Sequence, residues 1–123
     1  MPGRTVLVVD DSAAVRRAVS LMLRSAGYDC VDEPDGAKAL ERLETDKIDI
    51  VVTDLNMPVM NGWKFIEQMR SQREMRFIPV LVLTTECHDD VVTRLKQSGV
   101  TGVLQKPIER DELLTALRRV ESA

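Results

Sequence analysis

The sequence contains few of the residues that mark disulfide-rich or metal-thiolate proteins. In 123 residues it has two cysteines, Cys30 and Cys87, and one histidine, His88. Two cysteines so far apart do not make a disulfide framework. We interpret Cys30 as a buried strand residue. We interpret Cys87 and His88 as a loop leading into a helix, since two adjacent ligands without further partners make a poor metal site.

Long apolar runs and runs of one charge are also missing. No apolar stretch approaches the roughly 20 residues that span a bilayer, and the N-terminal Met-Pro-Gly-Arg lacks the apolar region of a signal peptide. A net charge of −3, with scattered Lys and Arg, argues against nucleic-acid and anionic membrane partners. We therefore expect a cytoplasmic protein that binds neither nucleic acid nor membrane.

What the sequence does contain is a regular alternation of short apolar runs and amphipathic patterns. Its length suits one domain over residues 1–123. Strands are predicted at Thr5–Val9, Cys30–Glu33, Ile48–Thr53, Val80–Leu83 and Gly102–Gln105. A helical pattern follows each run, and the helices are introduced by Ser12, Asp35, Asn61, Asp89–Asp90 and Pro107. This strict alternation predicts an α/β fold, in which a parallel sheet has helices on both faces.

Polar residues follow four of the five predicted strands. They are Asp10–Asp11, Asp54, Thr84 and Lys106. Because the carboxyl ends of parallel strands meet at one edge of a sheet, we expect these side chains to lie close together. Only the run Cys30–Glu33 contributes nothing obviously reactive, which fits an edge strand in the order 2-1-3-4-5 known from doubly wound folds.

Three carboxylates facing one ammonium group indicate a cation site. Like charges a few ångströms apart raise carboxylate pKa values unless a cation lies between them. Oxygen ligands without nearby Cys or His favour a hard ion, and we expect Mg²⁺, with Mn²⁺ able to substitute. Taken alone, Asp10–Asp11 is better explained by helix capping before Ser12. Its coincidence with Asp54 at one sheet edge favours the metal.

Asp54 lies where a nucleophile would be useful, between a buried run and a turn-rich loop. A carboxylate can attack phosphorus to form an acyl phosphate. Phosphoryl transfer requires positioning and charge neutralisation more than further covalent chemistry. Lys106 would pair with one phosphoryl oxygen and the Thr84 hydroxyl would donate to another. Taken singly, Thr84 also fits a strand end and Lys106 a solvated charge.

Over essentially its whole length the chain resembles the receiver-domain family of two-component response regulators. The matching pieces, each after the expected strand, are Asp10-Asp11, Asp54-x-x-Met57-Pro58-x-x-x-Gly62, Thr84 and Lys106-Pro107. The resemblance implies a (βα)5 doubly wound, flavodoxin-like three-layer sandwich. It also implies that a sensor histidine kinase phosphorylates Asp54 and that Thr84 and Lys106 sense the added group.

The resemblance carries further implications for the metal and the partners. Asp11, Asp54 and the Asn56 carbonyl would hold the ion, with Asp10 acting through water. The Lys106–Pro107 bond would be cis. Phosphorylation would change the face made by the fourth helix, fifth strand and fifth helix, and that face would control a downstream protein. A phosphatase is a further expected partner.

The chain departs from the family at two positions and matches a subfamily at two others. Thr85 stands where relatives often carry Ala, and we expect its bulk to slow the access of phosphodonors and water to Asp54. Val103 replaces an aromatic residue that turns inward in many relatives, so signalling would rely on backbone shifts. Asn56 and Glu86 flank the phosphoryl position and tune its lifetime. Together with residues 83–86 they resemble single-domain chemotaxis regulators that bind the flagellar motor switch.

Other functions fit less well. A phosphatase or mutase of the haloacid-dehalogenase kind would need a second Asp two residues after the nucleophile, where this chain has Asn56. A degenerate receiver acting only as an interaction module would lack Asp54, Lys106 or the acidic pair. A receiver belonging to a larger regulator stays open. We expect a signalling module, not an enzyme, because its only reactions are self-phosphotransfer and self-hydrolysis. Kinase specificity is expected on the first helix, at residues such as Ala14, Arg17 and Leu21.

Overall fold

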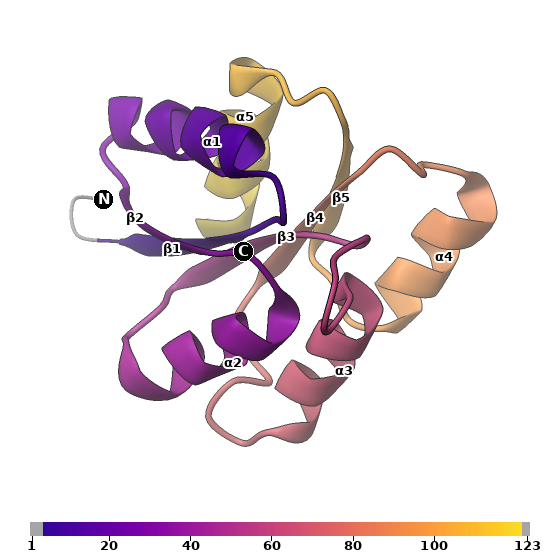
Figure 1. The fold of residues 1–123 in the computed structure, drawn as a ribbon. Helices are drawn as coiled ribbons and strands as arrows, with labels where there is room; N and C mark the ends of the chain where they lie inside the picture. Colours follow the sequence, from indigo (N-terminus) through magenta and orange to yellow (C-terminus); the bar gives the residue numbers. More distant parts are fainter. Residues whose placement is uncertain (1–3, 122–123) are drawn as a thin grey trace.

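The computed structural model describes residues 4–121, so residues 1–3, which entered the prediction about a signal peptide, lie outside it. The five strands are β1 Thr5–Val9, β2 Asp29–Glu33, β3 Ile50–Asp54, β4 Val80–Thr84 and β5 Gly102–Gln105. The five helices are α1 Ala13–Ser25, α2 Gly36–Thr45, α3 Gly62–Ser71, α4 Asp89–Gln97 and α5 Arg110–Glu121. Strands and helices alternate without exception along the described chain (Figure 1).

All strand pairs are parallel, and the sheet order is β2-β1-β3-β4-β5. This confirms the predicted order 2-1-3-4-5, with β2 at an edge. The register pairs Val9 with Thr53 and Asp54 with Leu83, so neighbouring strands end at nearly the same height. The loops that follow β1, β3 and β4 are therefore brought together at one end of the sheet.

The sheet is covered on both faces, with α1 and α5 on one side and α2, α3 and α4 on the other (Figure 1). Alternate residues of each central strand feed two separate cores. Leu7 and Val9 pack with α2, α3 and α4, whereas Val6 and Val8 pack with α1 and α5. Burial on both faces explains why these strands read as continuous apolar runs rather than alternating patterns.

The helix starts follow the predicted caps. The side chains of Ser12, Asp35 and Asn61 each accept a hydrogen bond from the backbone N–H three residues later. Asp89 and Asp90 were expected to precede the fourth helix and instead form its first turn. Negative charge is favourable there because the helix N-terminus exposes unpaired N–H groups.

The third strand begins at Ile50, later than the predicted Ile48. The Asp49 carboxylate accepts a hydrogen bond from the Thr5 N–H at 2.8 Å. Residue 49 therefore contacts the start of β1 through its side chain, and β3 begins only at the next residue. An apolar run alone cannot reveal such a side-chain contact.

The predictions for the two cysteines are confirmed. Cys30 lies buried in β2, and burial raises the pKa of its thiol to about 11. Cys87 lies in the loop before α4, with His88 at the helix N-cap. Within residues 4–121, no helix has the length and apolar character needed to cross a membrane.

Candidate functional site: an acidic cluster at the carboxyl edge

Three carboxylates meet where β1 and β3 end. One oxygen from each of Asp10, Asp11 and Asp54 lies within 4.8 Å of the others. Asp10 is 2% exposed and Asp54 is 7% exposed, whereas Asp11 is open to solvent. The sheet topology thus assembles residues separated by more than forty positions, as the sequence predicted.

Asp54 is the last residue of β3 and is held at both carboxylate oxygens. Oδ1 accepts the Leu55 N–H at 2.7 Å, and Oδ2 lies 3.3 Å from the Lys106 ammonium. Burial raises the pKa of Asp54 above its ordinary value, and the charge of Lys106 offsets part of this rise. A nearby cation would favour the ionised carboxylate that a nucleophile requires.

Lys106 follows β5 and is bound most closely to Asp10, with Nζ 2.7 Å from Oδ2. Burial disfavours the ammonium, but hydrogen bonds and charge from Asp10 and Asp54 outweigh it and raise the pKa of Lys106. Lys106 therefore pairs with two of the three carboxylates. The remaining negative charge and the all-oxygen donor set suit a hard divalent ion such as Mg²⁺.

Asp10 combines a place in the acidic cluster with a contact to the residue that caps α1. Its Oδ1 accepts the Ser12 N–H at 2.9 Å, and Ser12 in turn caps α1 by accepting the Val15 N–H. Asp11, by contrast, makes no hydrogen bond or ion pair with any residue from 4 to 121. Its exposed carboxylate is positioned by the backbone alone, which leaves its oxygens available for a ligand.

The loop after β3 passes very close to the start of α3. A Cβ at Gly62 would overlap the Asp54 carbonyl oxygen and press on Leu55, so only glycine fits. The Gly62 N–H donates to the Leu55 carbonyl at 2.8 Å and closes the loop. This contact accounts for the fixed spacing between Asp54 and Gly62 in the motif.

Thr84, at the end of β4, is fully buried, and its hydroxyl accepts the Glu86 N–H at 3.0 Å. The Glu86 carboxylate accepts a hydrogen bond from the Asn56 side chain at 2.8 Å. A chain of contacts thus joins Thr84 to the loop carrying Asn56. The sequence indicated both Asn56 and Glu86 but gave no sign that they contact each other.

The remaining predicted residues lie around this centre. Thr85 is exposed and lines a groove together with Lys106 and Pro107. The Lys106–Pro107 bond is cis, as the resemblance implied. Val103 is half-buried in β5 and packs against the core beneath α2, α3 and α4, away from the acidic cluster.

Sequence reasoning missed one contact beside the cluster. Arg16 of α1 donates from Nη1 to the Asp10 carbonyl and from Nε to the Asp32 carboxylate, both at 2.7 Å. An arginine on a helix surface and an aspartate on an edge strand carry no local signal of such pairing. The strand β2, from which no obviously reactive residue was expected, is thereby joined through Asp32 and Arg16 to the loop after β1.

A five-stranded parallel sheet with a buried aspartate, two further carboxylates and a lysine at its carboxyl edge defines a phosphorylatable α/β switch module. The response regulator receiver domain model matches residues 6–118. The chain belongs to the response regulator receiver-domain family.

Individual relatives agree with this assignment. The chemotaxis protein CheY-3 of Vibrio cholerae is 35% identical over 116 residues, covering 94% of this chain and 89% of the relative. The structure of the Vibrio cholerae chemotaxis response regulator CheY4 is 40% identical, with a TM-score of 0.89 over 95% of this chain and 98% of that chain.

A third relative carries an ion. The receiver domain of the Pseudomonas aeruginosa sensor histidine kinase PA1611 has magnesium coordinated in its active-site cleft. It is 29% identical, with a TM-score of 0.90 over 98% of this chain and 99% of that chain.

Proposed function

We propose that Asp54 is the phosphoacceptor of this receiver domain and takes a phosphoryl group from a sensor histidine kinase. The observation that carries the proposal is the cluster itself: a buried carboxylate at a strand end, two carboxylates within 4.8 Å and an ammonium at 3.3 Å. Family membership supports the same role. The chain then acts as a switch whose phosphorylated form controls a downstream protein.

The transfer is a displacement at phosphorus. An oxygen of Asp54 forms the new P–O bond while the P–N bond of phosphohistidine breaks, and the imidazole nitrogen keeps the electron pair and takes up a proton. Lys106 exchanges part of its contact with Asp10 for a phosphoryl oxygen. The Thr84 hydroxyl, which here accepts from Glu86, has its own proton to donate to another phosphoryl oxygen.

The acidic cluster would hold the metal. Asp11 and Asp54 would be direct ligands together with the Asn56 carbonyl, and Asp10 would act through water. Mg²⁺ supplies neutralisation of the charge on the phosphoryl oxygens. Mn²⁺ would substitute because it accepts the same oxygen ligands. Of the three clustered carboxylates, the exposed Asp11 is the one without a protein partner among residues 4–121, and this supports its assignment as a ligand.

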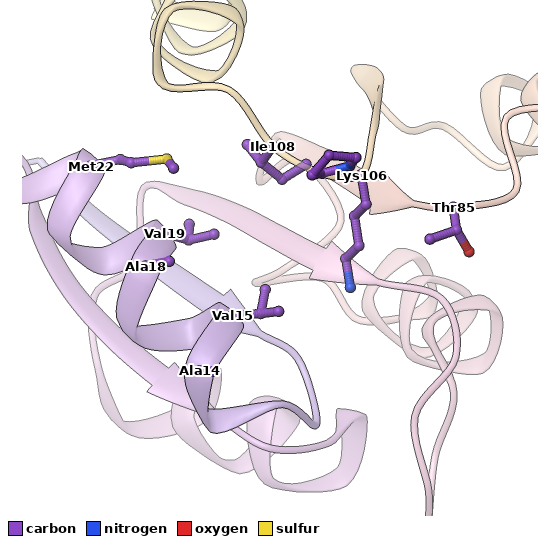
Figure 2. A pocket seen from close by; sticks show the side chains of 9 residues that line it. Ala14, Val15, Ala18, Val19, Met22, Thr85, Lys106 and Ile108 are labelled. Carbon is purple, nitrogen blue, oxygen red and sulfur yellow. The ribbon is translucent and has the colours of Figure 1, made fainter.

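A groove of about 480 Å³ supports the kinase as partner. It is lined by Ala14, Val15, Ala18, Val19, Met22, Thr85, Lys106, Pro107 and Ile108. In Figure 2 the α1 side chains form one wall, and the Lys106 side chain extends from the other wall. An apolar groove that reaches Lys106, whose ammonium lies 3.3 Å from Asp54, suits a kinase helix bearing the phosphohistidine. Of the residues expected to set specificity, Ala14 lines this groove, whereas Arg17 and Leu21 line the opposite flank of α1.

This chain acts in the cytoplasm, and its output is a protein that recognises the face formed by α4, β5 and α5. Chemotaxis is the favoured pathway because relatives named as chemotaxis regulators cover nearly the whole chain. The downstream partner would then be the flagellar motor switch, and a phosphatase would end the signal. With Val103 in place of an aromatic residue, the change at this face would proceed through backbone shifts.

The first experiment is intact-mass detection of a phosphoryl adduct after incubation with acetyl phosphate, with and without Mg²⁺. We expect a Mg²⁺-dependent adduct in the wild type and none in Asp54→Asn. If the wild type stays unmodified with acetyl phosphate, a phosphorylated histidine kinase replaces it as donor. Failure with both donors would overturn the proposal and favour the degenerate-receiver alternative.

The kinase groove has its own test. Ala18 is exposed on the groove wall, and Ala18→Glu places a charge there without touching the acidic cluster. We expect this variant to accept phosphate from acetyl phosphate at the wild-type rate and from the kinase much more slowly. Thr115→Glu, on exposed α5 surface, is the matched control. Equal kinase rates for all three proteins would exclude the groove as the docking surface.

A further inference from the structure

We infer that Arg16 is a positioning residue for the metal site, acting through the peptide that joins Asp10 to Asp11. This inference rests on the proposed metal site. The Arg16 guanidinium donates from Nη1 to the Asp10 carbonyl and from Nε to the Asp32 carboxylate, each at 2.7 Å. The guanidinium thus bridges the loop after β1 to the edge strand β2.

The geometry makes the Asp10 carbonyl an effective point of control. A peptide group is planar, so fixing the direction of the Asp10 carbonyl also fixes the N–H and Cα of Asp11. Asp11 makes no side-chain hydrogen bond or ion pair within residues 4–121, so nothing else orients its carboxylate. The direction of this metal-facing side chain is therefore set by the backbone that Arg16 holds.

The other contacts of Asp10 fix its position but leave this peptide plane to Arg16. The Asp10 N–H donates to the Glu33 carbonyl at 3.2 Å, and its carboxylate binds Ser12 and Lys106. These contacts precede the carbonyl along the chain or belong to the side chain. Within residues 4–121, Arg16 is the one donor to the Asp10 carbonyl.

Asp32 orients the arginine. The Arg16 side chain is 18% exposed, while that of Asp32 is 48% exposed. A short ion pair with a residue on β2 holds the guanidinium plane, so that one nitrogen faces the carboxylate and another faces the carbonyl. The planar, fork-shaped guanidinium makes both bonds at once, which a single ammonium cannot do with the same geometry.

The direction in which Mg²⁺ affinity changes when Arg16 is removed distinguishes a positioning role from a simple effect of charge. Arg16 is a cation near the proposed ion, so removing its charge alone would make Mg²⁺ bind more tightly. Loss of positioning would make Mg²⁺ bind more weakly, since partners of metal ligands typically contribute ten- to hundredfold in affinity. We expect Arg16→Ala to raise the Mg²⁺ Kd about tenfold, at the lower end of that range because the loop is at the surface.

The experiment is a Mg²⁺ titration of the full chain followed by backbone amide chemical shifts, which needs no phosphodonor. The variants are Arg16→Ala, Arg16→Lys, Asp32→Ala and the double variant. We expect Arg16→Lys and Asp32→Ala to give intermediate Kd values, and the double variant to match Arg16→Ala. The matched control is Arg17→Ala, which removes the same charge from an exposed neighbouring position and should leave Mg²⁺ affinity unchanged or slightly tighter.

A second readout separates positioning from general damage. At saturating Mg²⁺, Arg16→Ala should regain the wild-type rate of phosphorylation by acetyl phosphate, because only metal affinity is impaired. If Arg16→Ala does not fold, Arg16→Lys and Asp32→Ala carry the test. If the wild type binds Mg²⁺ and the Arg16 and Asp32 variants bind it equally tightly or more tightly, the inference about Arg16 is wrong, while the metal site itself still stands. A wild-type chain that binds no Mg²⁺ would overturn the metal site itself.

Discussion

Lys106 is hydrogen-bonded to Asp10, at 2.7 Å, and stands farther from Asp54, at 3.3 Å. The lysine that is expected to bind the phosphoryl group is thus held by a different carboxylate in the unphosphorylated chain. Its ammonium forms ion pairs with two of the three clustered carboxylates, Asp10 and Asp54. Phosphorylation would shift this charge toward Asp54 and free Asp10.

Replacing Lys106 by an uncharged residue should destabilise the metal-free protein and strengthen Mg²⁺ binding. Lys106→Met removes the ammonium, so the carboxylates repel one another. The metal-free protein should therefore unfold at a lower urea concentration. Mg²⁺ should bind about tenfold more tightly, equivalent to ~1.4 kcal/mol, because the repulsion of the ammonium is gone. Urea unfolding and Mg²⁺ titration measure the two effects. Lys96→Met, on exposed α4 surface, is the control, and weaker Mg²⁺ binding by Lys106→Met would contradict the argument.

Thr85 should slow access to Asp54. It is exposed beside Lys106 and Pro107, where its branched side chain adds bulk at the groove. Thr85→Ala should speed both phosphorylation by acetyl phosphate and hydrolysis of the adduct by about threefold, equivalent to ~0.7 kcal/mol in each barrier. Time courses by intact mass measure both rates, with Thr115→Ala as an exposed control. Unchanged rates would show that Thr85 does not restrict entry.

Asn56 and Glu86 should act as a pair on the lifetime of the phosphorylated form. Their side chains meet at 2.8 Å, and Glu86 also binds Thr84 through its N–H. A double-mutant cycle with alanine at both positions should therefore be non-additive in the hydrolysis rate, by about twofold or more. The exposed pair Lys64 and Glu67 on α3 provides a cycle that should show no effect. Additive effects at Asn56 and Glu86 would mean that their contact has no kinetic role.

Val59 stores backbone strain in the loop after β3. Its φ is +66°, which is costly for a β-branched residue, and its side chain is 85% exposed. The Met60 N–H donates to the Pro58 carbonyl at 2.7 Å across Val59, so Val59 is the central residue of a strained γ-turn. Val59→Asn should raise the free energy of unfolding by about 1 kcal/mol, and the melting temperature by roughly 3–5 °C. Val59→Thr keeps the branched side chain and should bring no gain. Thermal melts of the two variants compare them directly, and equal melting temperatures would argue against strain.

Cys30 should make stability fall at alkaline pH. Burial raises the pKa of its thiol to about 11, above the roughly 8.5 of an exposed thiol. As the pH rises, the unfolded chain therefore loses the thiol proton before the folded chain does. The stabilisation is fully present below the pKa of the unfolded thiol, and it is lost as the pH rises toward the pKa of the folded thiol. Between pH 8 and pH 10 the wild type should lose about 2 kcal/mol more stability than Cys30→Ala. Urea unfolding of both proteins at pH 8 and pH 10 measures the difference. Equal losses of unfolding free energy in the wild type and Cys30→Ala would contradict the prediction.

The fold was largely predictable because its signals are local. Buried parallel strands read as apolar runs, and Ser12, Asp35 and Asn61 mark helix starts by their own side-chain chemistry. Strand limits were less certain, as Ile48 shows, because an apolar residue next to a strand looks like part of it. The start of the fourth helix was placed two residues too late, because acidic residues such as Asp89 and Asp90 are favourable both at the cap and in the first turn.

The sequence by itself determined the alternating α/β fold and the residues that gather at its carboxyl edge, since each follows a strand whose apolar run is visible. Tertiary structure alone decided which of them touch. Lys106 binds Asp10 more closely than Asp54, Asn56 meets Glu86, and Arg16 joins Asp10 to Asp32. Such contacts depend on the direction of long polar side chains between distant segments, and that direction is set by packing and geometry rather than by any pattern along the chain.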